Sequence, residues 1–311
     1  MRLWHRIGTT VVGVAALLAT TAGTGQAATA TPPAGPPQTN FPAALLYSTT
    51  NAQASPPGAN DFSCKPTAAH PRPVVLVHGT VENAYDNWAE LSPQLKADGY
   101  CVFALNFGDK SPLPGNPFKG TEDIAASAGQ LSTYVNTVLA ATGATTVDLV
   151  GHSQGGMMPR YYLKNLGGAA KVNALVALAP SNYGTVFYGV LPLVAALPGG
   201  EAVAGLGCQA CVQQRQGSDF LNALNAGGDT QPGVKYTVIE TTYDEVVMPF
   251  TNAFLKGAGA TNILLQTVCP LDFTDHLGIS YDANAQQLVT NALDPAHAKR
   301  VVCQAVPPLV G

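Results

Sequence analysis

Residues 147–156 read VDLVGHSQGG, and this stretch decides the fold. Its first four residues are typical of a short buried strand. The rest matches the pattern G-x-S-x-G, in which Ser153 lies between Gly151 and Gly155. A helical pattern over residues 156–165 follows directly. Strand, tight turn and helix are the context in which this pattern raises a serine hydroxyl above the edge of a sheet.

An alternation of strands and helices continues on both sides of Ser153. Buried strands are predicted at Val74–Val77, Tyr100–Asn106, Val147–Val150, Val172–Leu178, Lys235–Thr241 and Asn262–Val268. Helices are predicted at Trp88–Asp98, Thr121–Ala141, Gly156–Asn165 and Asp282–Leu293. Strands that alternate with helices indicate an α/β fold, with a mostly parallel sheet of about six strands and helices on both faces.

The chain divides into a leader, an N-terminal segment and one large domain. Residues 1–27 are predicted to be a cleavable signal peptide, because Val11–Ala19 is a short apolar run and Gly25-Gln26-Ala27 fits a small-x-small cleavage site. An uncleaved membrane anchor is the alternative, and the shortness of the apolar run argues against it. Residues 28–60 are rich in proline and are expected to be extended, and residues 61–311 form the domain.

Composition excludes several classes of partner. The chain has 311 residues, of which 46% are hydrophobic and 11% charged, with a net charge of −4. No basic run exists, so we expect no nucleic-acid partner. No segment after the leader is long and apolar enough to span a membrane. With the predicted leader, we expect a secreted, extracellular protein that acts as a monomer.

The six cysteines form an even set behind an export signal, which suggests disulfides. The expected pairs are Cys64–Cys101, Cys208–Cys211 and Cys269–Cys303. Cys208 and Cys211 are also spaced like half of a zinc site, but no second Cys or His pair at ligand spacing supports a metal. We expect neither a metal nor a cofactor.

A neutral serine needs a base to become a nucleophile. In folds with this kind of turn, the chain order is serine, then acid, then histidine. Only His276 and His297 follow Ser153. His276 is favoured because it lies in the loop after the last predicted strand, whereas His297 lies in a segment near the C-terminus that reads as surface helix.

The acid and the oxyanion donors are predicted from strand ends. Asp244 follows the fifth predicted strand and is the favoured acid, with Glu245 as its close rival. The main-chain N–H of Gln154, directly after the serine, is one expected oxyanion donor. The second is the main-chain N–H of Thr80, in the His-Gly-Thr loop that ends at residue 80 after the first predicted strand.

Residues 182–233 are a long insertion between the fourth and fifth predicted strands. They form either a cap over the carboxyl edge of the sheet or an ordinary helix packed on the sheet, followed by a loop. Apolar residues of this insertion could line an acyl groove or belong to the core: Val186, Phe187, Val190, Leu191, Leu193 and Val194.

Five motifs together resemble the class 2 lipase family, the small secreted bacterial lipases of the α/β-hydrolase superfamily. They are VLVHGT at 75–80, DNW at 86–88, GHSQGG at 151–156, YDEVV at 243–247 and DHLGI at 275–279. The resemblance runs from about Asp61 to Cys303. It implies the α/β-hydrolase fold and hydrolysis of carboxylic esters, including triacylglycerols, without a cofactor.

By motif position, the resemblance assigns the triad to Ser153, Asp244 and His276 and the oxyanion N–H groups to Thr80 and Gln154. The smallest members of the family lack a lid, so the insertion departs from their form. A short-chain esterase or a cutinase-like polyesterase remains an alternative, as does an acyltransferase on the same triad. A non-enzymatic binding protein is a further alternative, against which the intact Ser, Asp and His argue.

Overall fold

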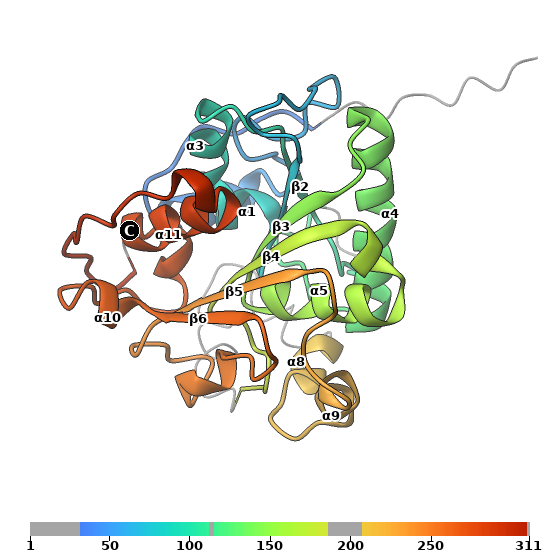
Figure 1. Ribbon diagram of the computed structural model, residues 1–311, viewed down its shortest axis with the longest axis vertical. Coiled ribbons are helices and arrows are strands. Elements are labelled where there is room, and N and C mark those ends of the chain that lie inside the picture. Colours follow the sequence, from blue (N-terminus) through green and yellow to red (C-terminus); the bar gives the residue numbers. More distant parts are fainter. Residues whose placement is uncertain (1–31, 112–114, 186–206, 310–311) are drawn as a thin grey trace, which may run out of the picture. The chain divides into compact units, whose positions relative to one another are not determined.

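Six parallel strands form the centre of the molecule, in the order β2-β1-β3-β4-β5-β6 (Figure 1). The structure is a computed structural model and describes residues 32–111, 115–185 and 207–309. The strands are β1 Val74–Val77, β2 Val102–Leu105, β3 Val147–His152, β4 Val172–Leu178, β5 Lys235–Glu240 and β6 Ala260–Leu264. The predicted α/β fold with a parallel sheet is confirmed.

Helices cover both faces of this sheet (Figure 1). On one face lie α4 (Ile124–Thr142) and α5 (Gln154–Asn165), and on the other lie α3 (Leu91–Ala97) and α11 (Ala283–Leu293). Successive strand side chains point to opposite faces, so every strand supplies both cores. In β1, Val75 belongs to the α4–α5 core. Its neighbour Leu76 packs with α3 and α11.

The longest helix, α4, has clear start and stop signals. The Asp123 side chain accepts a hydrogen bond from the Ala126 N–H and caps the free N–H groups of the first turn. Gly143, with a φ of 78°, ends the helix in the left-handed conformation that glycine adopts without strain. The predicted helix over 121–141 is therefore correct in kind and a few residues off at each end.

Two predicted elements differ from the structure in their extent. The helix expected at 88–98 is the shorter α3, and a separate helix that was not predicted, α2 (Ala84–Trp88), precedes it, started by a capping box of Asn83 and Asp86. The strand expected at 262–268 stops early, and Leu265–Val268 forms α10, with Leu265 buried in the core.

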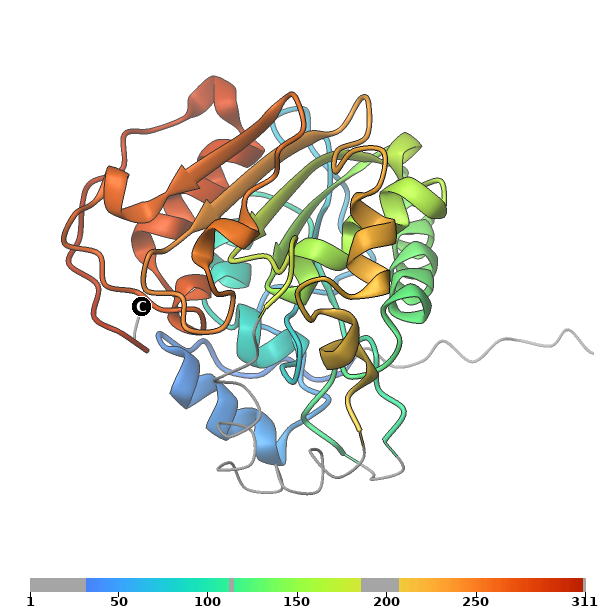
Figure 2. The same cartoon turned by 90° about the horizontal axis from the view of Figure 1, so that it is seen from below.

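The proline-rich segment contains a helix, α1 (Phe41–Thr50), where an extended chain was predicted. Asn40 caps it by accepting the Ala43 N–H, and a proline lies in its first turn, where a missing N–H costs nothing. Phe41 and Ala44 pack against Tyr85 of α2. Figure 2 shows α1, in blue, close to this part of the domain.

The described part of the insertion contains α8 (Gln209–Gln213) and α9 (Asp219–Asn225). Ala210, Leu221 and Leu224 from these helices join the core that also contains α4 and α5. The six apolar residues considered for an acyl groove lie outside the described residues, as does the predicted signal peptide.

Three disulfides join the pairs that the sequence predicted: Cys64–Cys101, Cys208–Cys211 and Cys269–Cys303. Because Cys208 and Cys211 are bonded to each other, the zinc alternative for this pair is wrong. Among the residues that the structure describes, no helix is long and apolar enough to cross a membrane.

The α4 core gives a stability prediction. Leu131 is completely buried in the core between α4 and the sheet, so we expect Leu131→Ala to lower the free energy of unfolding by roughly 2–5 kcal/mol through lost packing and the cavity left behind. The exposed Thr133 on the same helix provides the control, because Thr133→Ala removes little buried surface. Urea unfolding measures both; equal effects of the two changes would contradict this packing.

Candidate active site

Ser153 lies on a sharp turn between β3 and α5. Its φ of 53° and ψ of −121° are a strained combination for a residue with a side chain. Glycines make the turn possible: a Cβ on Gly155 would lie 2.1 Å from the Val77 carbonyl oxygen, and one on Gly151 would lie 1.8 Å from the Gly155 oxygen. The G-x-S-x-G pattern is therefore a packing requirement as well as a motif.

The structure brings the three predicted triad residues together. The Ser153 Oγ lies 3.0 Å from the His276 Nε2, and the His276 Nδ1 lies 2.7 Å from the Asp244 Oδ2. Asp244 follows β5 and His276 follows α10, which continues from β6. Their loops meet because the carboxyl ends of parallel strands lie at one edge of the sheet.

The Asp244 carboxylate is held firmly. Its Oδ1 accepts the main-chain N–H groups of Val246 and Val247 at 2.8 and 2.6 Å, which leaves Oδ2 for the imidazole. The side chains of Ser153, Asp244 and His276 are all buried. Charge-assisted bonds of this kind are strong in a site from which water is excluded.

The two rival residues lie elsewhere. His297 is exposed and pairs with Asp294 at 2.8 Å. The side chain of Glu245 contacts the main chain of His276 rather than its ring: the Glu245 Oε2 accepts the His276 main-chain N–H at 3.2 Å. Neither residue makes the contact that a triad member needs, and the geometry therefore favours His276 as the base and Asp244 as the acid.

Negative charges surround the imidazole of His276. Burial alone would lower the pKa of His276, but the charge and hydrogen bond of Asp244, together with the charges of Glu245 and Glu82, outweigh it and raise this pKa to about 9. The surroundings of the ring thus stabilise its charged imidazolium form.

The loop after β1 lies beside the start of α5. The Thr80 hydroxyl donates to the Gln154 Oε1 at 2.6 Å and accepts from the Gln214 Nε2 at 2.8 Å. Gly120 allows close packing here, because a Cβ on it would lie 2.8 Å from the Gly79 oxygen. Gln154 begins α5, where the first N–H groups have no partner within the helix.

Three buried polar residues near the site were not singled out from the sequence. Gln214 follows α8 in the insertion, and its Oε1 accepts the Ser181 hydroxyl at 2.7 Å. No motif marks it, so only the folded chain shows its position. His152 occupies the variable position directly before Ser153 in the serine motif, and Glu82 lies between two motifs. The contact between the two, and that of His152 with the His276 oxygen, are long-range in sequence.

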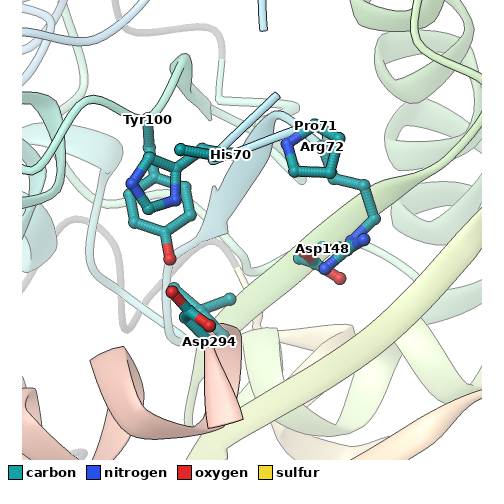
Figure 3. A pocket seen from close by; sticks show the side chains of 8 residues that line it. His70, Pro71, Arg72, Tyr100, Asp148 and Asp294 are labelled. Carbon is teal, nitrogen blue, oxygen red and sulfur yellow. Dashed lines mark hydrogen bonds and ion pairs between the residues drawn. The ribbon is translucent and has the colours of Figure 1, made fainter. Parts of the chain in front are cut away.

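A separate cavity lies at the opposite end of β3. It is lined in part by His70, Arg72, Tyr100, Asp148 and Asp294, and has a volume of about 40 Å³ (Figure 3). The Arg72 Nε donates to Asp148 Oδ2 at 2.8 Å, and the His70 ring lies against Tyr100. This volume suits a water or two.

Comparison with known proteins identifies the family of the chain. Residues 71–288 match the model of the class 2 lipase family. A triacylglycerol lipase of Pseudarthrobacter phenanthrenivorans is 40% identical over 99 residues, which cover 30% of this chain and 28% of that protein. Lipase B of Pseudozyma antarctica is 30% identical over 218 residues, covering 67% of this chain and 57% of that protein.

Solved structures show the same fold. Lipase B of Aspergillus fumigatus superposes with a TM-score of 0.62 at 23% identity, over 83% of this chain and 61% of that one. A mature Bacillus licheniformis lipase gives 0.53 at 17% identity, over 73% of this chain and 94% of that one. The fold is that of the α/β-hydrolases, and with the family match over residues 71–288 the chain belongs to the class 2 lipase family.

Proposed function

We propose that this protein is a secreted carboxylic ester hydrolase, of the triacylglycerol lipase type, with Ser153 as its nucleophile. One observation carries the proposal: a continuous line of contacts from the Ser153 Oγ through His276 to Asp244, at 3.0 and 2.7 Å, on a strained turn at the carboxyl edge of the sheet. The triacylglycerol lipases among its relatives support the substrate class.

In the first half-reaction, the Ser153 Oγ attacks the ester carbonyl carbon while the His276 Nε2 takes the hydroxyl proton. Asp244 accepts from the Nδ1–H, which keeps Nε2 free to act as the base. The oxyanion is stabilised by the main-chain N–H groups of Thr80 and Gln154, at roughly 3–4 kcal/mol per donor. The imidazolium then protonates the leaving alcohol.

In the second half-reaction, a water molecule attacks the acyl-enzyme while His276 takes its proton. The carbonyl–Oγ bond breaks, the proton returns to the Ser153 Oγ and the carboxylic acid leaves. An alcohol in place of water would give acyl transfer on the same residues. The difference lies only in the nucleophile that reaches the acyl group.

Apolar side chains beside the triad support an insoluble substrate. Tyr243 precedes Asp244, and its ring packs on Phe273, which lies three residues before His276. Both are exposed, at 45% and 42%. The exposed Leu309 is tied to the same region, because its N–H donates to Asp275 Oδ2 at 2.9 Å. Exposed apolar groups of this kind suit contact with a lipid surface.

Removal of the nucleophile is the first test. We expect Ser153→Ala to lower kcat on p-nitrophenyl esters by roughly 10⁶-fold with an unchanged melting temperature, because only the attacking oxygen is lost. The exposed Ser63 gives the control, and Ser63→Ala should keep full activity. Activity of the Ser153→Ala protein close to that of the unchanged protein would rule out the proposed nucleophile.

The same assay over a series of acyl lengths defines the substrate. Turnover that persists on long chains is expected of a lipase. Turnover confined to short chains would instead assign a short-chain esterase or a polyesterase. Ester products formed from an added alcohol, in excess of free acid, would assign an acyltransferase.

A second test distinguishes the roles of Asp244 and Glu245. Asp244→Asn should lower kcat by roughly 10⁴-fold, because the amide favours the wrong tautomer of His276. Glu245→Gln should retain most of kcat, since its amide oxygen can still accept the His276 N–H. The reverse ranking in steady-state kinetics would make Glu245 the triad acid.

The pKa of His276 predicts the pH profile. Only the neutral ring can take the serine proton, so kcat/KM should rise as the pH passes through this pKa, which lies near about 9. The midpoint should therefore lie above 6.5, the ordinary value for histidine. Glu245→Gln removes a charge that raises this pKa, and its profile should shift to lower pH. A midpoint at or below 6.5 in the unchanged protein would contradict this electrostatic account.

A further inference from the structure

A second pair of acid and histidine lies beside the triad. Glu82 and His152 are buried, and the His152 Nδ1 lies 3.0 Å from the Glu82 Oε2. His152 immediately precedes Ser153, and its ring centre lies 4.9 Å from that of His276. The chemical steps described above make no use of this pair, although burying two ionisable groups is expensive.

The pair connects three segments of the site. Glu82 Oε2 also accepts the Gly79 N–H at 2.9 Å, on the loop that carries Thr80. On the other side, the His152 Nε2 lies 2.8 Å from the main-chain oxygen of His276. One continuous line of contacts therefore runs from the loop that carries Thr80, here called the oxyanion loop, through Glu82 and His152 to the main-chain oxygen of His276.

The acceptors around His152 define its protons. The carbonyl oxygen of His276 can only accept, so Nε2 must carry a proton. The Glu82 Oε2 accepts the Gly79 N–H, as a carboxylate oxygen does. Burial alone would raise the pKa of Glu82, but the charge and hydrogen bond of His152 outweigh it and hold this pKa below its usual value. A proton on Nδ1 as well, directed at the Glu82 Oε2 at 3.0 Å, would make the ring a cation and the contact an ion pair.

Asn87 is the other neighbour of Nδ1, at 3.1 Å from its Nδ2. Its amide orientation is set by the Gly79 N–H, which donates to Asn87 Oδ1 at 3.1 Å, and its Nδ2 has an acceptor in the Ser280 hydroxyl at 3.2 Å. One N–H of Asn87 therefore has an acceptor other than His152, and a proton on Nδ1 would give the buried Glu82 Oε2 a second donor besides the Gly79 N–H.

We propose that Glu82 and His152 form an ion pair that positions the oxyanion loop and the backbone of His276 around Ser153. The proposal rests on the proposed function, since it gives these residues a role in the same reaction. They are positioning residues, because neither bonds to the side chain of Ser153 or His276. A misplacement of about 1 Å at such a site can cost roughly 10²-fold in rate.

Exchange of the pair for apolar side chains separates positioning from stability. Glu82→Leu and His152→Phe each break a buried pair, so each should lower the melting temperature. The double variant removes both charges and should recover most of the melting temperature. We expect kcat to be roughly 100-fold lower in all three proteins, with KM nearly unchanged. Recovery of kcat together with stability in the double variant would make the pair merely structural and overturn the proposal.

Arg72 supplies a matched control at the other end of β3. It pairs with the buried Asp148, so Arg72→Leu also leaves a carboxylate without its partner. Figure 3 shows this pair in the small cavity. We expect this variant to lose stability and to keep kcat. An equal loss of kcat here would show that destabilisation alone lowers the rate, which would contradict a positioning role for Glu82 and His152.

Nitrogen-15 NMR of protein labelled at its histidines reports which ring nitrogens of His152 carry a proton, without any assay of activity. Both ring nitrogens of His152 should be protonated, with the signals identified by their loss in His152→Phe. Glu82→Gln removes the negative charge, so Nδ1 should lose its proton and accept the Asn87 Nδ2–H, while the new amide oxygen still accepts the Gly79 N–H. A bare Nδ1 in the unchanged protein would mean that it accepts from Asn87, and the ion pair would be wrong. Because the NMR result does not depend on turnover, it stands or falls separately from the proposed function.

Discussion

The close approach of Gly155 to the end of β1 is the constraint on which the site depends. With no side chain at this position, the first turn of α5 can lie against the Val77 carbonyl, and Ser153 is held in its strained turn above the sheet. The loop that follows β1 then lies beside the first residues of α5. The close packing of Gly155 against the end of β1 therefore helps to bring Ser153 and the loop of Thr80 together.

Parallel strands bring in the remaining groups. Because all six strands run in one direction, the loops after β1, β3, β5 and β6 open at the same edge of the sheet. This edge gathers several acids around His276, among them Asp244 and Glu245, and the field of these acids favours the charged imidazole. A cationic His152, held by Glu82, would balance part of this negative charge within a region that excludes water.

Much of the fold could be predicted from the sequence because its signals are local. The β-branched run at Val74–Val77 and the serine motif after β3 specify strands and a turn without reference to the rest of the chain. The helix at Phe41–Thr50 carries a local signal too, the Asn40 cap followed by a proline, but the surrounding proline-rich composition masks it. The early end of β6 has no such signal, since burial of Leu265 depends on tertiary packing.

The residues of the candidate site also differ in whether the sequence could predict them. Ser153, Asp244 and His276 could be selected by motif and chain order, and the structure places their side chains in contact. Gln214 and Glu82 lie outside any motif. Gln214 contacts Thr80, which is 134 positions away in the sequence, and Glu82 contacts His152, which is 70 positions away. Such contacts depend on the folded chain, so a single sequence carries no pattern that predicts them.

Trapping of the acyl-enzyme tests the central claim most directly. The protein is mixed briefly with p-nitrophenyl butyrate and quenched in acid, and its peptides are analysed by mass spectrometry while p-nitrophenol release is followed by stopped flow. The account predicts one butyryl group on the peptide that contains Ser153, with a burst of p-nitrophenol equal to the enzyme concentration if release of the acyl group is the slower step. Hydrolysis that proceeds with the acyl group on another residue, and none on Ser153, would contradict it.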